Sequence, residues 1–308
     1  YSDENAYTIF ETMNDRGLNL TPSEMLKGYV LSRFDQPAKR HQANELWKQA
    51  VLQLKAYDKD EDQRFFQSWL RARYADSIRP GKAGSKNEDF EKIGTRFHSW
   101  VRDNLDKVGL DSSDSNSFER FVQQDLRFYL KAYLRILDAE RSLTKGLEPV
   151  YYINHWGIAP TLSYPLMLAA LNTNDDDATV SAKISMVASY IETFVVRRSV
   201  NFRNFSASSI RYTMYSLVKE LRGLDLPAMQ ALLARKLADM KESFVSMDKF
   251  RMHGQNKRFV KFLLARMTAW CEQQAGMSTN FVTYYQPVSG KPFEVEHIWA
   301  DKFSRHRD

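Results

Sequence analysis

The stretch TPSEMLKGYVLSRF, residues 21–34, decides the fold class of this chain, because it carries the signals of a docked α-helix. Thr21 can cap the helix, Pro22 suits its first turn, and Glu24 can reach back to complete a capping box. After this start, apolar side chains recur on one helical face: Met25, Leu26, Tyr29, Val30 and Phe34. One apolar face predicts a helix that packs against a protein core.

The same apolar spacing of three and four residues recurs along most of the chain, whereas the alternation typical of strands is nearly absent before the C-terminal region. We therefore predict a mainly α fold, with a multi-helix body and a short terminal β segment. The predicted helices cover residues 3–14, 21–34, 39–57, 60–78, 87–105, 117–144, 161–172, 177–199, 206–222, 226–243 and 255–275.

Two polar stretches, residues 79–87 and 109–117, interrupt this pattern, and their Gly, Lys, Ser and Asp content predicts surface loops. Neither loop separates halves of different composition, and the sequence has no repeat of solenoid length, which favours one helical body over residues 1–276. The pattern changes after about Met277, so a new unit is predicted for residues 277–308. Both ends of the sequence are expected to continue into a longer polypeptide.

Composition limits the class of protein. Apolar residues make up 43% of the 308 residues, enough to offset the ordering entropy that keeps polar chains disordered. The 44 Lys and Arg exceed the 38 Asp and Glu, which permits a phosphate-bearing partner but does not require one. A single cysteine, Cys271, excludes an internal disulfide and a Cys-based zinc site and favours the cytoplasm. No apolar run approaches the roughly 20 residues of a membrane span, so no membrane partner is expected.

Residues 9–22 join two predicted helices through a tight polar turn. Gly17 can adopt the positive φ angle that such a turn needs, and Arg16 can bridge to Glu11 or to a phosphate. A connecting turn with a buried ion pair explains Asn14 and Arg16 without any ligand. The residues alone leave both interpretations open.

The run Phe-Glu-Thr-Met-Asn-Asp-Arg-Gly, residues 10–17, closely resembles the Phe-Glu-x-x-Asn-x-Arg-Gly signature of the GmrS-like family. That family includes GmrSD-type modification-dependent restriction endonucleases and phosphorothioate-linked phage-defence nucleases. The resemblance implies a nucleotide triphosphate cofactor, bound mainly by a ParB-like fold that precedes this helix pair. The Asp-Gly-Gln-Gln-Arg motif of that fold is absent from this chain. The resemblance also implies that Asn14 and Arg16 lie beside the nucleotide pocket.

Other basic residues have both a structural and a ligand-binding interpretation. Lys27 lies one helical face from the turn and, as an isolated lysine, is expected to be a solvated surface residue. Arg197 and Arg198 end an apolar helix, where cations complement the helix dipole. GmrS-like proteins have a similar Arg-Arg helix end, so a phosphate-binding role is the alternative for this pair.

A further basic stretch, residues 251–266, resembles the helix that leads towards the nuclease domain in GmrS-like proteins. Packing of its apolar residues explains most of the stretch. Its basic residues are predicted to contact DNA phosphates without base specificity: Lys257, Arg258 and Lys261.

Residues 293–299 alternate like a strand. Within them Glu296-His297-Ile298 resembles the first strand of an HNH (ββα-metal) nuclease, the C-terminal domain of GmrD-like proteins. The resemblance implies that His297 is the catalytic base and that Glu296 helps to hold a divalent metal such as Mg²⁺. Adjacent strand residues point to opposite faces, so a bulge or a strand end is needed to bring both to one metal. The other Asn and His of such a site are expected downstream of Asp308.

The remaining histidines are assigned no chemistry, because none has an Asp, Glu or His partner at metal-ligand spacing. These residues are His41, His98, His155 and His253, and His306 is expected to be exposed in its charged surroundings.

The resemblance therefore predicts part of a nucleotide-regulated endonuclease that recognises modified foreign double-stranded DNA. On this hypothesis the chain is mostly scaffold and is inactive alone, whereas the complete protein cleaves phosphodiester bonds through its HNH domain. A homo-oligomer is compatible with this hypothesis. The alternative is a non-enzymatic helical DNA-binding or adaptor module of a defence system.

Overall fold

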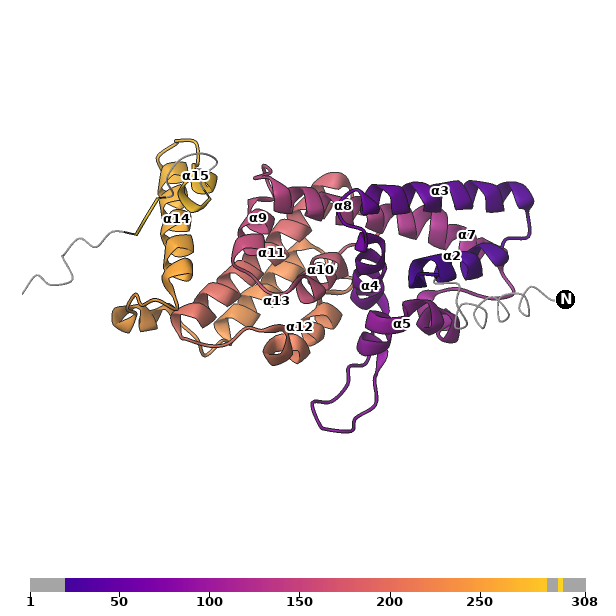
Figure 1. The fold of residues 1–308 in the computed structure, drawn as a ribbon, viewed down its shortest axis with the longest axis horizontal. Coiled ribbons are helices and arrows are strands. Elements are labelled where there is room, and N and C mark those ends of the chain that lie inside the picture. The colour runs from indigo at the N-terminus through magenta and orange to yellow at the C-terminus, as the bar shows by residue number, and fades with distance from the viewer. Residues whose placement is uncertain (1–19, 287–292, 296–308) are drawn as a thin grey trace, which may run out of the picture.

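Helices dominate residues 20–286 and 293–295, the part of the chain that the computed structural model describes (Figure 1). The prediction of a mainly α fold is confirmed. Apart from one isolated bridge between Asp111 and Asp114, this part has no β-structure. The helices are α2 (Pro22–Ser32), α3 (Pro37–Lys55), α4 (Glu61–Tyr74), α5 (Asp89–Asp103), α6 (Leu105–Val108), α7 (Ser115–Arg120), the π-helix η1 (Phe121–Leu126), α8 (Arg127–Arg141), α9 (Glu148–His155), α10 (Pro160–Ala169), α11 (Asp177–Val200), α12 (Ala207–Leu221), α13 (Leu226–Ala238), the 3₁₀-helix η2 (Phe244–Lys249), α14 (Lys257–Gln274) and α15 (Phe281–Tyr285).

The predicted start of α2 is confirmed atom by atom. The Thr21 backbone N–H donates to Glu24 Oε2 at 2.7 Å, and the Glu24 backbone N–H donates to Thr21 Oγ1 at 3.3 Å. The predicted apolar face is buried from Met25 to Phe34. This helix is therefore fixed locally at its start and docked along its length.

The helix boundaries differ from the predicted ones where local strain or packing intervenes. The helix predicted over residues 117–144 is three consecutive segments, because a π-helical turn, η1, separates α7 from α8. The π turn buries Phe121, whose ring stacks on Trp69 at 4.9 Å between centroids. The prediction missed α9, whose sequence contains Pro149 and ends at Asn154-His155-Trp156-Gly157, a pattern typical of a turn.

The predicted terminal β segment falls mostly outside the described residues. Phe293, Glu294 and Val295 are described and form no regular secondary structure, while the rest of the predicted strand, from Glu296 onward, is not described. The first predicted helix, residues 3–14, also lies outside the described residues.

α4 is the central helix of the larger core, because it packs against α3, α5, α8 and α10. Its side chains Phe65, Phe66 and Trp69 are almost completely buried. Phe66 stacks on Trp47 of α3 at 5.1 Å, and Trp69 stacks on Tyr129 of α8 at 5.5 Å. Offset aromatic pairs of this kind add to the large apolar area that such residues bury. The aromatic residues of α4 thus hold helices from both sides in one core.

α14 and α15 form a second core with α9 and α11 at the opposite end of the molecule from α2 and α3 (Figure 1). Phe262 of α14 and Phe281 of α15 are completely buried. Arg266 of α14 ion-pairs with Glu192 of α11 at 2.5 Å and lies 3.7 Å from the centre of the Tyr152 ring of α9. These contacts fix the direction of α14 relative to the body.

α11 is long and apolar enough to cross a membrane by length and composition alone. However, 56% of its apolar window is buried within the protein. The helix packs against α9, α10 and α13. Its apolar character is therefore that of a core helix.

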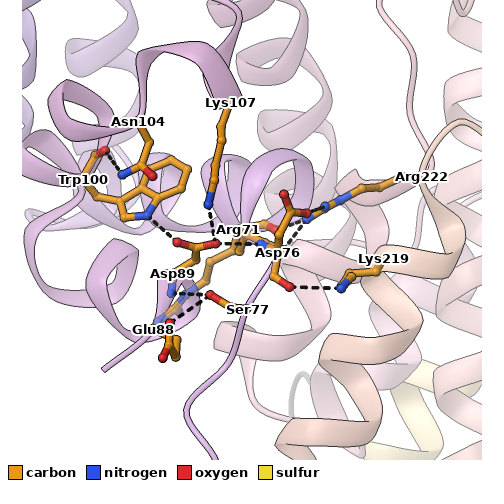
Figure 2. A network of polar contacts seen from close by, with 11 residues as sticks. Arg71, Asp76, Ser77, Glu88, Asp89, Trp100, Asn104, Lys107, Lys219 and Arg222 are labelled. Atoms are coloured by element: carbon orange, nitrogen blue, oxygen red, sulfur yellow. Dashed lines mark hydrogen bonds and ion pairs between the residues drawn. The ribbon is translucent and has the colours of Figure 1, made fainter. Parts of the chain in front are cut away.

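The carboxyl end of α4 lies in a polar network that joins the two halves of the sequence (Figure 2). Arg222, directly after α12, donates to the backbone carbonyl groups of Ala72 at 2.7 Å and Ala75 at 2.8 Å, and to that of Arg71 at 3.1 Å. It also ion-pairs with Asp76 at 2.9 Å. The last carbonyl groups of a helix have no partner within the helix, and a guanidinium there also complements the helix dipole. Arg222 thus caps α4 from a distant segment.

Asp89, the first residue of α5, organises the other half of this network (Figure 2). Its buried carboxylate accepts hydrogen bonds from Trp100 Nε1 at 2.9 Å, the Asp76 backbone N–H at 3.0 Å and Lys107 Nζ at 3.1 Å. Burial alone raises a carboxyl pKa, but these donors outweigh it, so the Asp89 pKa lies below its ordinary value. Both ends of the loop between α4 and α5 are therefore held by charged groups.

We expect Arg222→Ala to lower the free energy of unfolding by about 3 kcal/mol, because it leaves buried carbonyl groups and Asp76 without their charged donor. Chemical denaturation measures the change. The matched control is Arg127→Ala, at an exposed position of α8, which should change the unfolding free energy by less than about 0.5 kcal/mol. Equal effects of the two substitutions would contradict the capping role.

Glu140 gives the fold a pH dependence. Its carboxylate accepts a hydrogen bond from Tyr164 at 2.7 Å, yet burial raises its pKa to about 7. The folded state therefore holds a proton that the unfolded state releases near pH 4.5, and Glu140 destabilises the fold as the pH rises from about 4.5 to 7. Relative to Glu140→Gln, the wild type should lose about 2 kcal/mol of unfolding free energy between pH 5 and 7.5. Parallel stability curves for the two proteins would show that Glu140 titrates normally.

Candidate nucleic-acid interface

The amino end of α14 gathers cations where a helix normally prefers anions. Lys257 and Arg258 occupy its first turn and are exposed, and Lys261 is half-buried one turn later. The first turn contains no acidic residue, and Asn256 gives it no side-chain cap. The helix dipole places a partial positive charge at the same end, so these cations repel it unless an anion lies nearby. This arrangement is suited to bind phosphate groups.

These cations are little neutralised by the surrounding chain. Within residues 20–286 and 293–295, Lys257 and Lys261 form no ion pair. Among the described residues, Arg258 donates only to the hydroxyl of Tyr285, at 3.3 Å, which positions its guanidinium without cancelling its charge. The surface thus keeps its positive potential.

Lys261 lines a cavity of about 270 Å³ between α14 and the C-terminal described segment. The opposite wall contains Tyr284 and the three consecutive residues 293–295. Val295 directly precedes Glu296 in the sequence. A predicted phosphate-contacting lysine therefore lies beside the residues that lead into the predicted nuclease motif.

Glu272 holds the turn that brings α15 back onto α14. Its carboxylate accepts from the Asn280 backbone N–H at 3.0 Å and from the Tyr284 hydroxyl at 2.5 Å. These hydrogen bonds lower the Glu272 pKa and keep the group charged. The turn thereby places Tyr284 and Tyr285 on the same side of α14 as the basic residues Arg258 and Lys261.

His155, assigned no chemistry from the sequence, lies under this surface. Its ring packs against Tyr151, Phe281 and Tyr285, and its buried Nε2 has no hydrogen-bond partner in the described part of the chain. Burial, together with the charge of Arg258, lowers its pKa. Both effects favour the neutral imidazole, so His155 serves as a packing residue.

Phe202 has a strained backbone next to this surface. It follows the C-cap of α11 and has φ 53°, the left-handed conformation that glycine normally supplies at this position. The backbone N–H of Arg203 donates to the carbonyl of Arg198 at 2.8 Å, the hydrogen bond of a Schellman motif. A left-handed non-glycine residue costs roughly 1–2 kcal/mol. Position 202 therefore carries a phenylalanine that is 62% exposed, at a backbone cost that glycine would not have.

The Phe202 ring forms an aromatic platform with two residues of the segment that leads into α14. It stacks on Phe250 at 5.5 Å and on His253 at 5.8 Å between centroids. Phe250 in turn packs edge-on against Phe259, beside Arg258. Exposed aromatic rings next to cations are a common way to hold nucleic-acid bases and phosphates together. We name Phe202, His253, Lys257, Arg258 and Lys261 the α14 surface.

The structure leaves several predicted site residues untested. Asn14, Arg16, Glu296 and His297 lie outside the described residues. In the part of the chain that the structure describes, no group of three or more His, Cys, Asp or Glu side chains is arranged to hold a metal ion. The predicted metal site therefore stays a prediction.

The Arg-Arg end of α11 has a structural role. Arg197 donates to the Leu237 carbonyl at 2.5 Å and lies over the Phe244 ring. Arg198 donates to the Asn204 carbonyl and ion-pairs with Glu242 at 3.2 Å. These partners explain both arginines without a phosphate.

Comparison of the chain with family models, with curated proteins and with solved structures finds no match.

Phe202 provides a test that separates backbone strain from the function of the ring. Phe202→Gly should keep the unfolding free energy within about 1 kcal/mol of the wild type, because relief of left-handed strain offsets the lost ring contacts. Phe202→Ala keeps the strain and should be less stable than Phe202→Gly by about 1 kcal/mol. Both substitutions should weaken DNA binding equally in fluorescence anisotropy. Wild-type DNA affinity in both would show that the ring serves only for packing.

Proposed function

We propose that this chain is the helical scaffold of a nucleotide-regulated, modification-dependent DNA endonuclease that acts in anti-phage defence. The complete protein binds modified foreign double-stranded DNA and cleaves its phosphodiester bonds. The chain alone contributes DNA contacts and positions the segment that leads to the nuclease motif. Cytoplasmic location and assembly into a homo-oligomer are further parts of this proposal.

One observation carries the proposal: Lys261, one turn after the cationic amino end of α14, and the segment 293–295 line the same cavity. A nuclease needs a phosphate-binding surface close to its reacting groups, because correct placement of the backbone lowers the barrier to attack. The sequence supplies a metal ligand and a base, Glu296 and His297, directly after Val295. The charge and the sequence motif thus support the same function.

The chemical roles come from the resemblance to HNH nucleases. Glu296 helps to hold a divalent metal ion, which stabilises the leaving oxygen when bound, and His297 takes the proton of the attacking water. Asn14 and Arg16 contribute to the nucleotide site, with Arg16 as the phosphate-binding group. The non-enzymatic adaptor is the alternative, and it shares the DNA-binding surface but not the cleavage.

Salt dependence tests the contacts to DNA. We assume that Lys257 and Lys261 each neutralise one phosphate. Lys257→Met and Lys261→Met should then each reduce, by about 0.9, the magnitude of the slope of log K for DNA association against the logarithm of the salt concentration. The matched control is Lys82→Met, on the exposed loop between α4 and α5, which should leave the slope unchanged. Slopes equal to that of the wild type for both α14 variants would remove these lysines from the interface.

Cleavage tests the enzymatic part on the complete protein. With Mg²⁺ and modified phage DNA, His297→Ala should abolish cleavage and leave DNA binding intact, because the imidazole is the proposed base. Arg16→Ala should weaken nucleotide binding or nucleotide-stimulated cleavage. If the complete protein binds DNA but never cleaves it, the adaptor is the correct alternative.

A further inference from the structure

α14 has a second apolar face, which the described part of the chain leaves largely open. Its first face, which includes Phe259 and Phe262, is buried against the body. On the other side of the helix, Leu264 is 44% exposed, Met267 55% and Trp270 57%. A helix on the surface of a protein normally has a polar outer face, and a helix that is apolar all round is normally buried. The outer face of α14 is therefore that of a helix with a further partner.

The exposed apolar side chains of α14 are neighbours, which distinguishes them from single exposed residues. On α3, at the opposite end of the molecule (Figure 1), Leu52 is the one large apolar side chain among the exposed residues of the helix. Such isolated residues are normal on protein surfaces. On α14, by contrast, Phe293 is 56% exposed and adjoins Leu264 in the wall of the same cavity, which extends the apolar face. Contiguous apolar surface of this kind marks an interaction site.

Charged side chains avoid this face. Between residues 259 and 271 the sequence has two charged residues, Lys261 and Arg266. Arg266 turns inward to its ion pair with Glu192 of α11. Lys261 lies to one side, where it lines the cavity beside residues 293–295. The apolar face therefore runs without interruption along most of α14.

The spacing of this face is the same in both directions along the helix. Its central line consists of Val260, Leu264, Met267 and the exposed Cys271, at steps of four, three and four residues. Steps of three and four are those of paired helices. Because the order of steps is unchanged on reversal, an antiparallel copy of α14 meets this line in register. Leu264 then lies opposite Met267 of the second copy, and Val260 opposite its Cys271.

The two ends of α14 are also electrostatically complementary. The first turn contains Lys257 and Arg258 and no acidic residue, whereas the last turn contains no basic residue. The last turn contains Glu272, and the free carbonyl groups after it carry a partial negative charge. An antiparallel pair places Lys257 of each copy beside the carboxyl end of the other, while a parallel pair places like charges together. The charges therefore favour a second copy of this chain in the antiparallel direction.

We propose that two copies of this chain pair through the outer face of α14, related by a twofold axis between Leu264 and Met267. Each contact then occurs twice, as in other interfaces with twofold symmetry. Trp270 lies at the edge of the central line and covers it, in keeping with the frequency of Trp and Met in protein interfaces. Arg258 and Lys261 lie away from this line, at about 100° of rotation per residue, and stay open to phosphate. The pairing names the interface of the homo-oligomer proposed above and rests on that part of the proposal.

Sedimentation equilibrium of the complete protein over a range of concentrations tests the pairing. We expect a dimer that dissociates on dilution. Met267→Glu should weaken it by at least about tenfold, because each copy then buries an unpaired carboxylate against Leu264 of the other. Leu264→Lys should have the same effect. An equimolar mixture of the two variants should regain dimers, because one carboxylate then faces one ammonium group.

Controls separate loss of pairing from loss of folding. Leu264 and Met267 are exposed in the single chain, so melting curves of both variants should match that of the wild type. Leu52→Glu, at an exposed apolar position of α3, should leave the dimer unchanged. A protein that is monomeric at every concentration, or a dimer that survives both Met267→Glu and Leu264→Lys, would overturn the proposal.

Cross-linking tests the antiparallel register. Val260→Cys should be joined to Cys271 of the second copy by a short bismaleimide, and Cys271→Ser added to this variant should abolish the product. The wild type should give no product, because its two Cys271 residues lie eleven residues apart along the paired helices, roughly 16 Å. Cross-linking of the wild type through Cys271 would show a parallel pair and contradict the proposed register.

The same variants distinguish failure of the pairing from failure of the proposed function. Dimers that Met267→Glu dissociates, in a complete protein that never cleaves DNA, support the pairing and contradict the endonuclease. A complete protein that cleaves modified DNA but is monomeric at every concentration supports the endonuclease and contradicts the pairing.

Discussion

The carboxyl end of α4 lies within the protein, where its carbonyl groups need donors that water does not supply. Arg222 provides them, although 148 positions separate it from Tyr74, the last residue of α4. This single side chain joins α12 to α4, the helix around which α3, α5, α8 and α10 pack. Together with Lys219, which donates to the Asp76 carbonyl at 3.0 Å, it ties the second half of the sequence to the first. The loop between α4 and α5 is then held in place by Asp76 and Asp89, which share the same network (Figure 2).

The position of α4 also determines which buried polar side chains lie within hydrogen-bond distance of a partner. Along most of the core the buried polar groups are satisfied, as Asp89, Lys183 and Glu61 show. At the start of α4, one carboxylate oxygen of Asp62 accepts a hydrogen bond from Ser23, and the other oxygen has no described partner. The indole N–H of Trp47 has no described partner either. Buried polar atoms without a described hydrogen-bond partner also occur elsewhere in the core, at Trp69 Nε1 and at the Tyr215 hydroxyl.

The sequence predicted the helices well because their signals are local. The capping box of Thr21 and Glu24, and apolar side chains at spacings of three and four, depend only on near neighbours. The errors arose where tertiary contacts decide. η1 interrupts a long helical pattern so that Phe121 can stack on Trp69, and α9 forms despite residues typical of a turn because Tyr151, Tyr152 and Ile153 are buried. The charges at 257, 258 and 261 were readable as a basic face, whereas the strained φ of Phe202 and its stacking on His253 depend on packing that no sequence spacing encodes.

The cations of α14 are placed by the same packed body that surrounds α4. α4 packs on α10, α10 packs on α11, and α11 is tied to α14 through the ion pair of Glu192 with Arg266. Close-packed interiors hold their elements in defined positions. The position of Lys257, Arg258 and Lys261 therefore follows from the packing of helices that are distant from them in the sequence.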